Sequence, residues 1–238
     1  PKRRWCLVLV AVSLLVYANA LFADFAMDDF MAVVDNGDVS RNSLSQGLFQ
    51  NDFWGSPLDG ASHKSYRPLA VLTFRWDHMI AGSTAWMFHL SNVLWNAVVC
   101  VVVVYTVLAH HQRINGSSSS VNGTEGNSHR SSRGGGWWRW LSSASVSASE
   151  QVDVFVLVAA MLFAVHPMHT ESVTGVVGRA DILSALLAFA AYHYHSVGMR
   201  ESMRTNQQAL GSLVRTLALA FLSALCKETG ITVLAVCG

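Results

Sequence analysis

Long apolar stretches separated by polar segments set the pattern of this chain. A helix rises about 1.5 Å per residue and a hydrocarbon core is about 30 Å thick, so about 20 apolar residues can cross a membrane. The apolar stretches predict complete or partial membrane spans at about 5–23, 86–109, 152–166, 180–198, 212–226 and, as the start of another, 230–238. We therefore predict an all-α polytopic membrane protein, in which residues 1–238 are the N-terminal part of a multi-span domain.

Composition excludes a soluble domain. Hydrophobic residues make up 52% of the chain and charged residues only 13%. The first apolar stretch follows Lys2-Arg3-Arg4, as in a secretory signal peptide, but it is longer than the usual apolar core of about 7–15 residues. Asp24-Phe25 also stands where small residues would mark a cleavage site. We expect an uncleaved first membrane helix.

The charges predict an orientation. If the spans alternate from the N-terminus, 10 of the 16 basic residues fall on the N-terminal side, and 11 of the 15 acidic residues fall on the other side. Short loops rich in Lys and Arg stay in the cytosol. The N-terminus is therefore expected to be cytosolic, and the acidic face lumenal.

Two long polar segments separate the predicted spans. Residues 24–85 form a lumenal loop, in which Pro57 and Pro68 interrupt any long helix, so we expect short helices along the membrane surface. Residues 110–150 are rich in Ser, Gly and Asn, and the topology makes them a low-complexity cytosolic loop. The glycosylation sequons at Asn115 and Asn122 lie in that loop and are expected to be unused.

Adjacent carboxylates at Asp28 and Asp29 open the lumenal loop directly after the first span. Two neighbouring carboxylates repel each other, so a chemical role is a reasonable hypothesis for the pair. A carboxylate at a lumenal surface can act as a general base. The sequence does not separate the two, although we slightly prefer Asp29.

Further ionisable residues stand at the lumenal ends of the later spans, where burial near lipid is costly and often marks a site. Pro167 breaks the third predicted span, and the chain there presents His166, His169 and Glu171. Arg179 and Asp181 begin the fourth span. Arg179 either forms a structural pair with a carboxylate or binds an anionic head group, since a guanidinium suits phosphate.

Lys227 and Glu228 follow the fifth apolar stretch and are expected on the same lumenal side as Arg179 and Asp181. They either pair with each other, or Lys227 neutralises phosphate in the same cavity. Lys64 and Arg67 lie in the lumenal loop, where they belong to a solvated surface or to a wall that contacts a charged head group.

Other site classes have weak support. His166, His169 and Glu171 form a His-x-x-His pattern broken by proline, so we predict no metal site, although a divalent metal remains possible. The four cysteines lack metal-ligand spacing. The chain shows neither a nucleophile elbow nor a phosphate-binding glycine loop.

The order of these motifs resembles the transmembrane and tetratricopeptide-repeat-containing family of endoplasmic-reticulum protein O-mannosyltransferases. The resemblance covers nearly the whole chain and rests on these segments: Asp28-Asp29, Asn51-Asp52-Phe53-Trp54-Gly55, Ser62-His63-Lys64-Ser65-Tyr66-Arg67-Pro68-Leu69, His166-Pro167-Met168-His169-Thr170-Glu171, Val176-Val177-Gly178-Arg179-Ala180-Asp181 and Cys226-Lys227-Glu228. The Ser/Gly-rich loop departs from the family pattern as an insertion. The family's later helices and repeats are expected beyond Gly238.

The resemblance implies a glycosyltransferase-C-like helix bundle in the endoplasmic reticulum membrane. The implied activity is that of a dolichyl-phosphate-mannose-protein mannosyltransferase, which inverts the sugar configuration and modifies Ser or Thr of lumenal, cadherin-type acceptors. Asp28 or Asp29 would be the base. Arg179 and Lys227 would stabilise the departing phosphate, while His166, His169 and Glu171 would shape the cavity and orient the sugar.

Three alternatives stay open. The protein could be a noncatalytic membrane scaffold whose lumenal charges only pair with one another. It could also be a transferase that uses another lipid-linked sugar. A transporter fits less well, because the charges gather near one bilayer face and not along several spans.

Overall fold

The computed structural model describes residues 2–40, 47–60, 62–121, 148–201 and 206–237. The long helices are α1 (Lys2–Val16), α4 (Ala85–Val121), α5 (Ala148–Ala164), α7 (Arg179–Glu201) and α8 (Asn206–Cys226). The shorter ones are η1 (Ala18–Phe22), η2 (Phe30–Val34), α2 (Gly37–Ser40), α3 (Pro68–Ala81), α6 (His169–Thr174), η4 (Glu228–Thr232) and α9 (Val233–Cys237). Within these ranges the chain has no β-strand beyond one isolated bridge, between Asn51 and Pro57. The predicted all-α membrane protein is confirmed.

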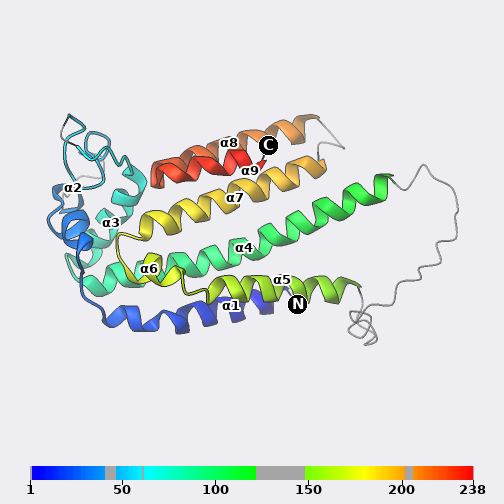
Figure 1. The fold of residues 1–238 in the computed structure, drawn as a ribbon, viewed down its shortest axis with the longest axis horizontal. Coiled ribbons are helices and arrows are strands. Elements are labelled where there is room, and N and C mark those ends of the chain that lie inside the picture. The colour runs from blue at the N-terminus through cyan, green and yellow to red at the C-terminus, as the bar shows by residue number, and fades with distance from the viewer. Residues whose placement is uncertain (1, 41–46, 61, 122–147, 202–205, 238) are drawn as a thin grey trace, which may run out of the picture.

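The long helices lie side by side along one direction (Figure 1). Helices α1 and α5 form one edge, α4 follows, and α8 with α9 forms the opposite edge. Helix α7 lies between α4 and α8 and packs against both. The short elements α2, α3 and α6 gather at one end of this bundle, which we call the polar end.

Three described helices are long and apolar enough to cross a membrane: Trp5–Phe22, Ala85–His111 and Ala209–Cys226. The apolar parts of α5 and of the η4–α9 segment are shorter, at Val154–Ala164 and Glu228–Cys237. Helix α7 has 23 residues and is long enough to cross a membrane, but it is not apolar enough to be counted among these candidate spans. Its sequence carries Ser184, His193 and His195, which lower its apolar character.

Two helix bounds differ from those expected. Helix α4 continues to Val121, well past the predicted end of its span at residue 109, and α5 begins at Ala148. Both ends of the segment that we assigned to a loop at 110–150 are therefore helical. The positions between 122 and 147, which include Asn122, lie outside the described residues.

Small polar groups join the helices inside the bundle. Asn96 of α4 donates to the Ser13 hydroxyl of α1 at 3.0 Å, and the Thr106 hydroxyl of α4 donates to the Phe189 carbonyl of α7 at 3.2 Å. The Ser223 hydroxyl of α8 donates to the Ser184 carbonyl of α7 at 2.8 Å. Such contacts satisfy buried polar groups and fix the register of membrane helices.

The polar end has its own hydrophobic core. Phe53 of the first loop, Phe74 of α3 and Phe88 of α4 are fully buried, and they pack with Val176 and Ala180 from the start of α7 and the turn before it. Aromatic side chains supply a large apolar area for their number. This core attaches the first loop to the bundle and so holds the candidate site residues in place.

Candidate active site

Asp28 and Asp29 have opposite environments. Asp29 is only 3% exposed, and its carboxylate accepts two backbone hydrogen bonds, from Val177 N–H at 3.0 Å and from Ala26 N–H at 3.1 Å. Asp28 is exposed, and no hydrogen bond to its carboxylate is found among the described residues. Asp29 therefore links the first loop to the turn before α7, while Asp28 is open to a reacting group.

The backbone around the two carboxylates is unusual. Met27 has a φ of 44°, a left-handed conformation that costs energy for a residue other than glycine. The π-helix η2 begins directly after Asp29. Single π-turns are rare and often lie at functional sites. The strain is a second feature that marks this segment as a candidate site.

Arg179 is fully buried, and each of its three guanidinium nitrogens donates to a partner in its own chain. Its Nη1 donates to the Asp77 carboxylate at 2.5 Å, its Nε to the Asn92 side-chain oxygen at 2.7 Å and its Nη2 to the Phe88 carbonyl at 2.7 Å. The guanidinium also lies 4.7 Å from the centre of the Phe74 ring. We call Arg179, Asp77 and Asn92 the buried arginine cluster.

The buried arginine cluster joins three helices, since Asp77 belongs to α3, Asn92 to α4 and Arg179 to α7. The Ser91 hydroxyl donates to the second Asp77 oxygen at 2.7 Å, and Asn92 Nδ2 donates to the Gly175 carbonyl at 2.9 Å. All three of its nitrogens donate within the chain and the side chain is fully buried, so no part of the guanidinium is open to a ligand. The geometry supports the structural alternative for Arg179, with Asp77 as its carboxylate, and not the phosphate-binding one.

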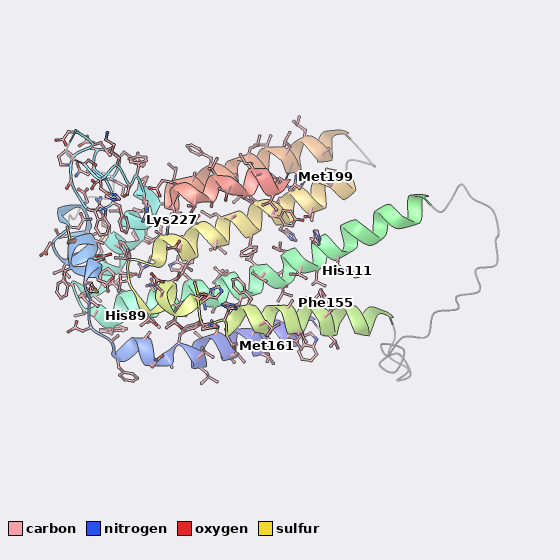
Figure 2. The ribbon with its side chains drawn as sticks, in the orientation of Figure 1. His89, His111, Phe155, Met161, Met199 and Lys227 are labelled. Atoms are coloured by element: carbon pink, nitrogen blue, oxygen red, sulfur yellow. The ribbon has the colours of Figure 1, made fainter. Side chains whose placement is uncertain are left out.

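Lys227 and Asp181 form a partly exposed pair. Lys227 Nζ donates to Asp181 Oδ1 at 2.5 Å, and the two side chains are 25% and 45% exposed. An ammonium has three donors, and Asp181 uses one of them. Figure 2 shows Lys227 at the polar end of the bundle. Lys227 is thus a cation that can still reach an anionic ligand.

A cavity of about 780 Å³ begins beside this pair and runs between the helices. Its polar groups at the polar end come from His169, Ser172, Asp181 and Thr229. Its walls are mostly apolar and come from α4, α5, α7 and α9: Val99, Val107, Phe163, Ile182, Ala185, Ala188, Phe189, Val233 and Val236.

The far part of the cavity reaches His110 and Tyr192, whose side chains form a hydrogen bond of 2.6 Å. On α7 the lining runs from Asp181 to Tyr192, a length of about 16 Å along the helix axis. An elongated apolar space with polar groups at one end, where the lining residue Asp181 pairs with Lys227, suits a molecule that has a hydrocarbon tail and a charged head.

Of the three residues expected around Pro167, the structure brings only His169 to the cavity lining. Its ring packs against Phe163, with 4.4 Å between the ring centres. Burial lowers the pKa of His169 below the usual value for an imidazole, and the neighbouring His166 lowers it further. His169 is therefore neutral near pH 7. His166 and Glu171 are exposed.

Arg67 and Glu228 pair with each other across 161 positions of the chain. Arg67 Nη2 lies 3.1 Å from Glu228 Oε2, and Arg67 Nε donates to the same carboxylate. Arg67 also lies over the Phe53 ring at 5.0 Å. The pair joins the first loop to η4 beside Lys227, which gives both residues a positioning role. Lys64 is exposed in the first loop, with a left-handed φ of 62°.

No cluster of at least three His, Cys, Asp or Glu side chains able to hold a metal is present in the described ranges. Sequence reasoning missed Asp77, Asn92 and His89, which the fold places at the polar end. Each is a polar residue within a largely apolar helical segment, and that isolation is a usable signal for a buried role.

Comparison with known proteins supports one family. The chain is 35% identical over 231 residues to mouse protein O-mannosyl-transferase TMTC3, and 40% identical over 238 residues to the Drosophila melanogaster Tmtc2 protein O-mannosyl-transferase. It is 33% identical over 242 residues to human TMTC1. Over nearly its whole length, this chain is similar to proteins named as TMTC protein O-mannosyl-transferases.

These alignments cover 97%, 98% and 97% of the chain, but only 20%, 21% and 22% of the respective relatives. The chain thus spans about a fifth of the length of the TMTC proteins that it matches. No family model matches the chain, and no solved structure does. The predicted resemblance to the TMTC family is confirmed.

Proposed function

We propose that this chain is part of a protein O-mannosyltransferase that takes mannose from dolichyl phosphate mannose and transfers it to Ser or Thr of a protein acceptor. The observation that carries the proposal is the cavity of about 780 Å³, whose walls are mostly apolar and whose lining includes Asp181, the partner of Lys227. The names of the TMTC relatives supply the sugar and the class of acceptor. The donor's phosphate would lie beside Lys227, and its isoprenoid tail along α7.

The transfer is written as a single displacement. The acceptor oxygen forms a bond to the anomeric carbon while the bond from that carbon to the phosphate oxygen breaks, so the configuration inverts. The hydroxyl proton passes to a carboxylate, and the electron pair leaves with dolichyl phosphate. Lys227 stabilises the charge that grows on this leaving group, which is a large effect in a site sheltered from water.

Asp28 is the better candidate for the base. Its side chain is exposed, whereas both Asp29 oxygens accept backbone N–H groups in a buried position. The structure thus favours Asp28, against the slight preference for Asp29 that the sequence suggested. The Asp29–Val177 bond also places Asp28 close to the turn that leads into Arg179 and Asp181.

Membrane topology completes the proposal. The segment between α1 and α2, Lys227 and the short elements lie at one end of the bundle (Figures 1 and 2), and the charge pattern makes that end lumenal. The N-terminus would then be cytosolic and the acceptor would be a lumenal or secretory protein, for example a cadherin-type domain. The endoplasmic reticulum is the membrane that supplies such a lipid-linked donor.

The deciding experiment measures mannose transfer from dolichyl phosphate mannose to a cadherin-type domain, in membranes that carry the full-length protein. Wild type is compared with Asp28→Asn and Lys227→Gln, and Lys64→Gln serves as an exposed control in the first loop. We expect transfer by wild type and the control, and strong loss in the other two. If wild type transferred a different lipid-linked sugar instead, the proposed donor would be wrong. If well-folded wild type transferred no sugar, the protein would be better explained as a noncatalytic scaffold.

A further inference from the structure

His89 is a buried histidine whose ring is not satisfied by the protein around it. It belongs to the first turns of α4 and is only 1% exposed. Neither ring nitrogen has a hydrogen bond of ordinary geometry to any described residue. A buried polar group without a partner costs about 1–3 kcal/mol, so its presence calls for a reason.

The position of His89 is defined by its neighbours on α4. Phe88 packs on Phe25, next to the Asp28–Asp29 segment, with 5.5 Å between ring centres. Asn92, one turn after His89 on the same face, donates to the Gly175 carbonyl. His89 therefore lies between the first loop and the turn that connects α6 to α7. Figure 2 shows it at the polar end of α4.

The groups that face the ring come from both of these segments. The backbone of Asp24 lies on the first loop, and the backbone of Thr174 lies at the end of α6. The Asp29 carboxylate and the Arg179 guanidinium are the charges within electrostatic range. The ring is thus within reach of backbone groups on both segments, although neither contact has ordinary hydrogen-bond geometry.

We propose that His89 is a positioning residue of the transferase, which holds the Asp28–Asp29 segment against the α6–α7 turn while mannose is transferred. In the structure described here the Asp29–Val177 hydrogen bond alone makes this connection with full geometry. His89 adds a second connection through its backbone contacts with both segments, and it thereby fixes where the Asp28 carboxylate points. The inference rests on the proposed transfer activity.

Replacing His89 separates this role from simple packing. The variant His89→Phe keeps a planar ring of similar shape but removes the two unsatisfied nitrogens, so the resting protein should be as stable as wild type or more so. Positioning predicts that kcat falls about tenfold to a hundredfold, since a displacement of about 1 Å can have that effect. Substrate binding should change little, with KM within about twofold.

Two further variants complete the design, each measured in full-length protein for kcat, KM and melting temperature in detergent. His89→Gln retains an N–H group and should recover a large part of the lost kcat. His111→Phe is the matched control, because His111 lies on the same helix toward its opposite end (Figure 2). It should leave kcat near the wild-type value.

The outcomes separate this inference from the proposed function. Wild-type kcat in His89→Phe, or equal losses of kcat and melting temperature in His89→Phe and His89→Gln, would overturn the positioning role while leaving the transferase intact. If folded wild type transferred no mannose, the proposed transferase function would be refuted, and the positioning role of His89 would be refuted with it. A low kcat in His89→Phe at undiminished melting temperature, with recovery in His89→Gln, would support it.

Discussion

Two cations at the polar end show how burial changes the role of a charge. Arg179 is fully buried and donates to Asp77, Asn92 and a backbone carbonyl, whereas Lys227 is 25% exposed and donates to Asp181 alone. Only Asp181 of these partners lines the cavity. Removal of either cation would affect the protein, but through folding in the first case and through ligand binding in the second.

The comparison teaches that a positive charge beside a cavity is not enough to assign a ligand. A fully buried arginine whose three nitrogens all donate within its own chain cannot reach a phosphate without giving up buried hydrogen bonds, which is costly. A partly exposed lysine with unused N–H donors can bind phosphate without losing buried hydrogen bonds. The predictions below test this division, from the largest expected effect to the smallest.

Replacing Arg179 should have the largest effect, on folding. Arg179→Met leaves Asp77 charged and buried, and breaking such a pair costs about 3–5 kcal/mol of stability. Protein yield in membranes and melting temperature in detergent measure the loss. The double variant Arg179→Met, Asp77→Leu should recover much of it, because both charges are gone. Normal stability in the single variant would refute the structural role.

Replacing Asp28 should affect activity, whereas replacing Asp29 should affect stability. Asp28→Asn should reduce mannose transfer about 10²–10⁴-fold with unchanged melting temperature, as expected for loss of a general base. Asp29→Asn places an amide against two backbone N–H groups and should lower stability by about 1–3 kcal/mol. Both variants are assayed for transfer and melting. Normal mannose transfer by Asp28→Asn would show that another residue is the base.

Replacing Lys227 should lower the rate of mannose transfer more than the stability of the protein. We expect Lys227→Gln to lower kcat about 10²-fold, the effect of removing one preorganised donor from a developing negative charge. The melting temperature should change little, since the Lys227–Asp181 pair is partly exposed. Lys227→Arg keeps the charge and is the matched control. Equal activity of Lys227→Gln and Lys227→Arg would exclude an electrostatic role.

The Arg67–Glu228 pair should give the smallest effect. Its carboxylate is half exposed, and exposed ion pairs contribute about 0–1 kcal/mol to stability. Arg67→Gln should therefore lower the melting temperature only slightly. The exchange Arg67→Glu, Glu228→Arg keeps the pairing with reversed sign and should restore it. A large loss of transfer in Arg67→Gln alone would instead place Arg67 at the ligand.

Several residues show what the sequence could reveal about the site. The adjacent carboxylates, the interruption at Pro167 and the charges at the predicted lumenal ends of the spans are visible without a structure. Contacts join several of these segments: Asp29 with Val177, Lys227 with Asp181 and Arg67 with Glu228. Their individual roles were not visible. Arg179 pairs with Asp77, which lies 102 positions earlier in α3, and no local pattern indicates that partner.

The apolar pattern and charge distribution of the sequence determined that this is an all-α membrane protein with its ionisable motifs at helix ends. These features are local, since about 20 apolar residues form a span whatever their neighbours. Tertiary structure alone decided which charges are enclosed and which stay open. Burial depends on segments distant in sequence, such as Phe74 and Phe88 around Arg179 and the helices around the cavity.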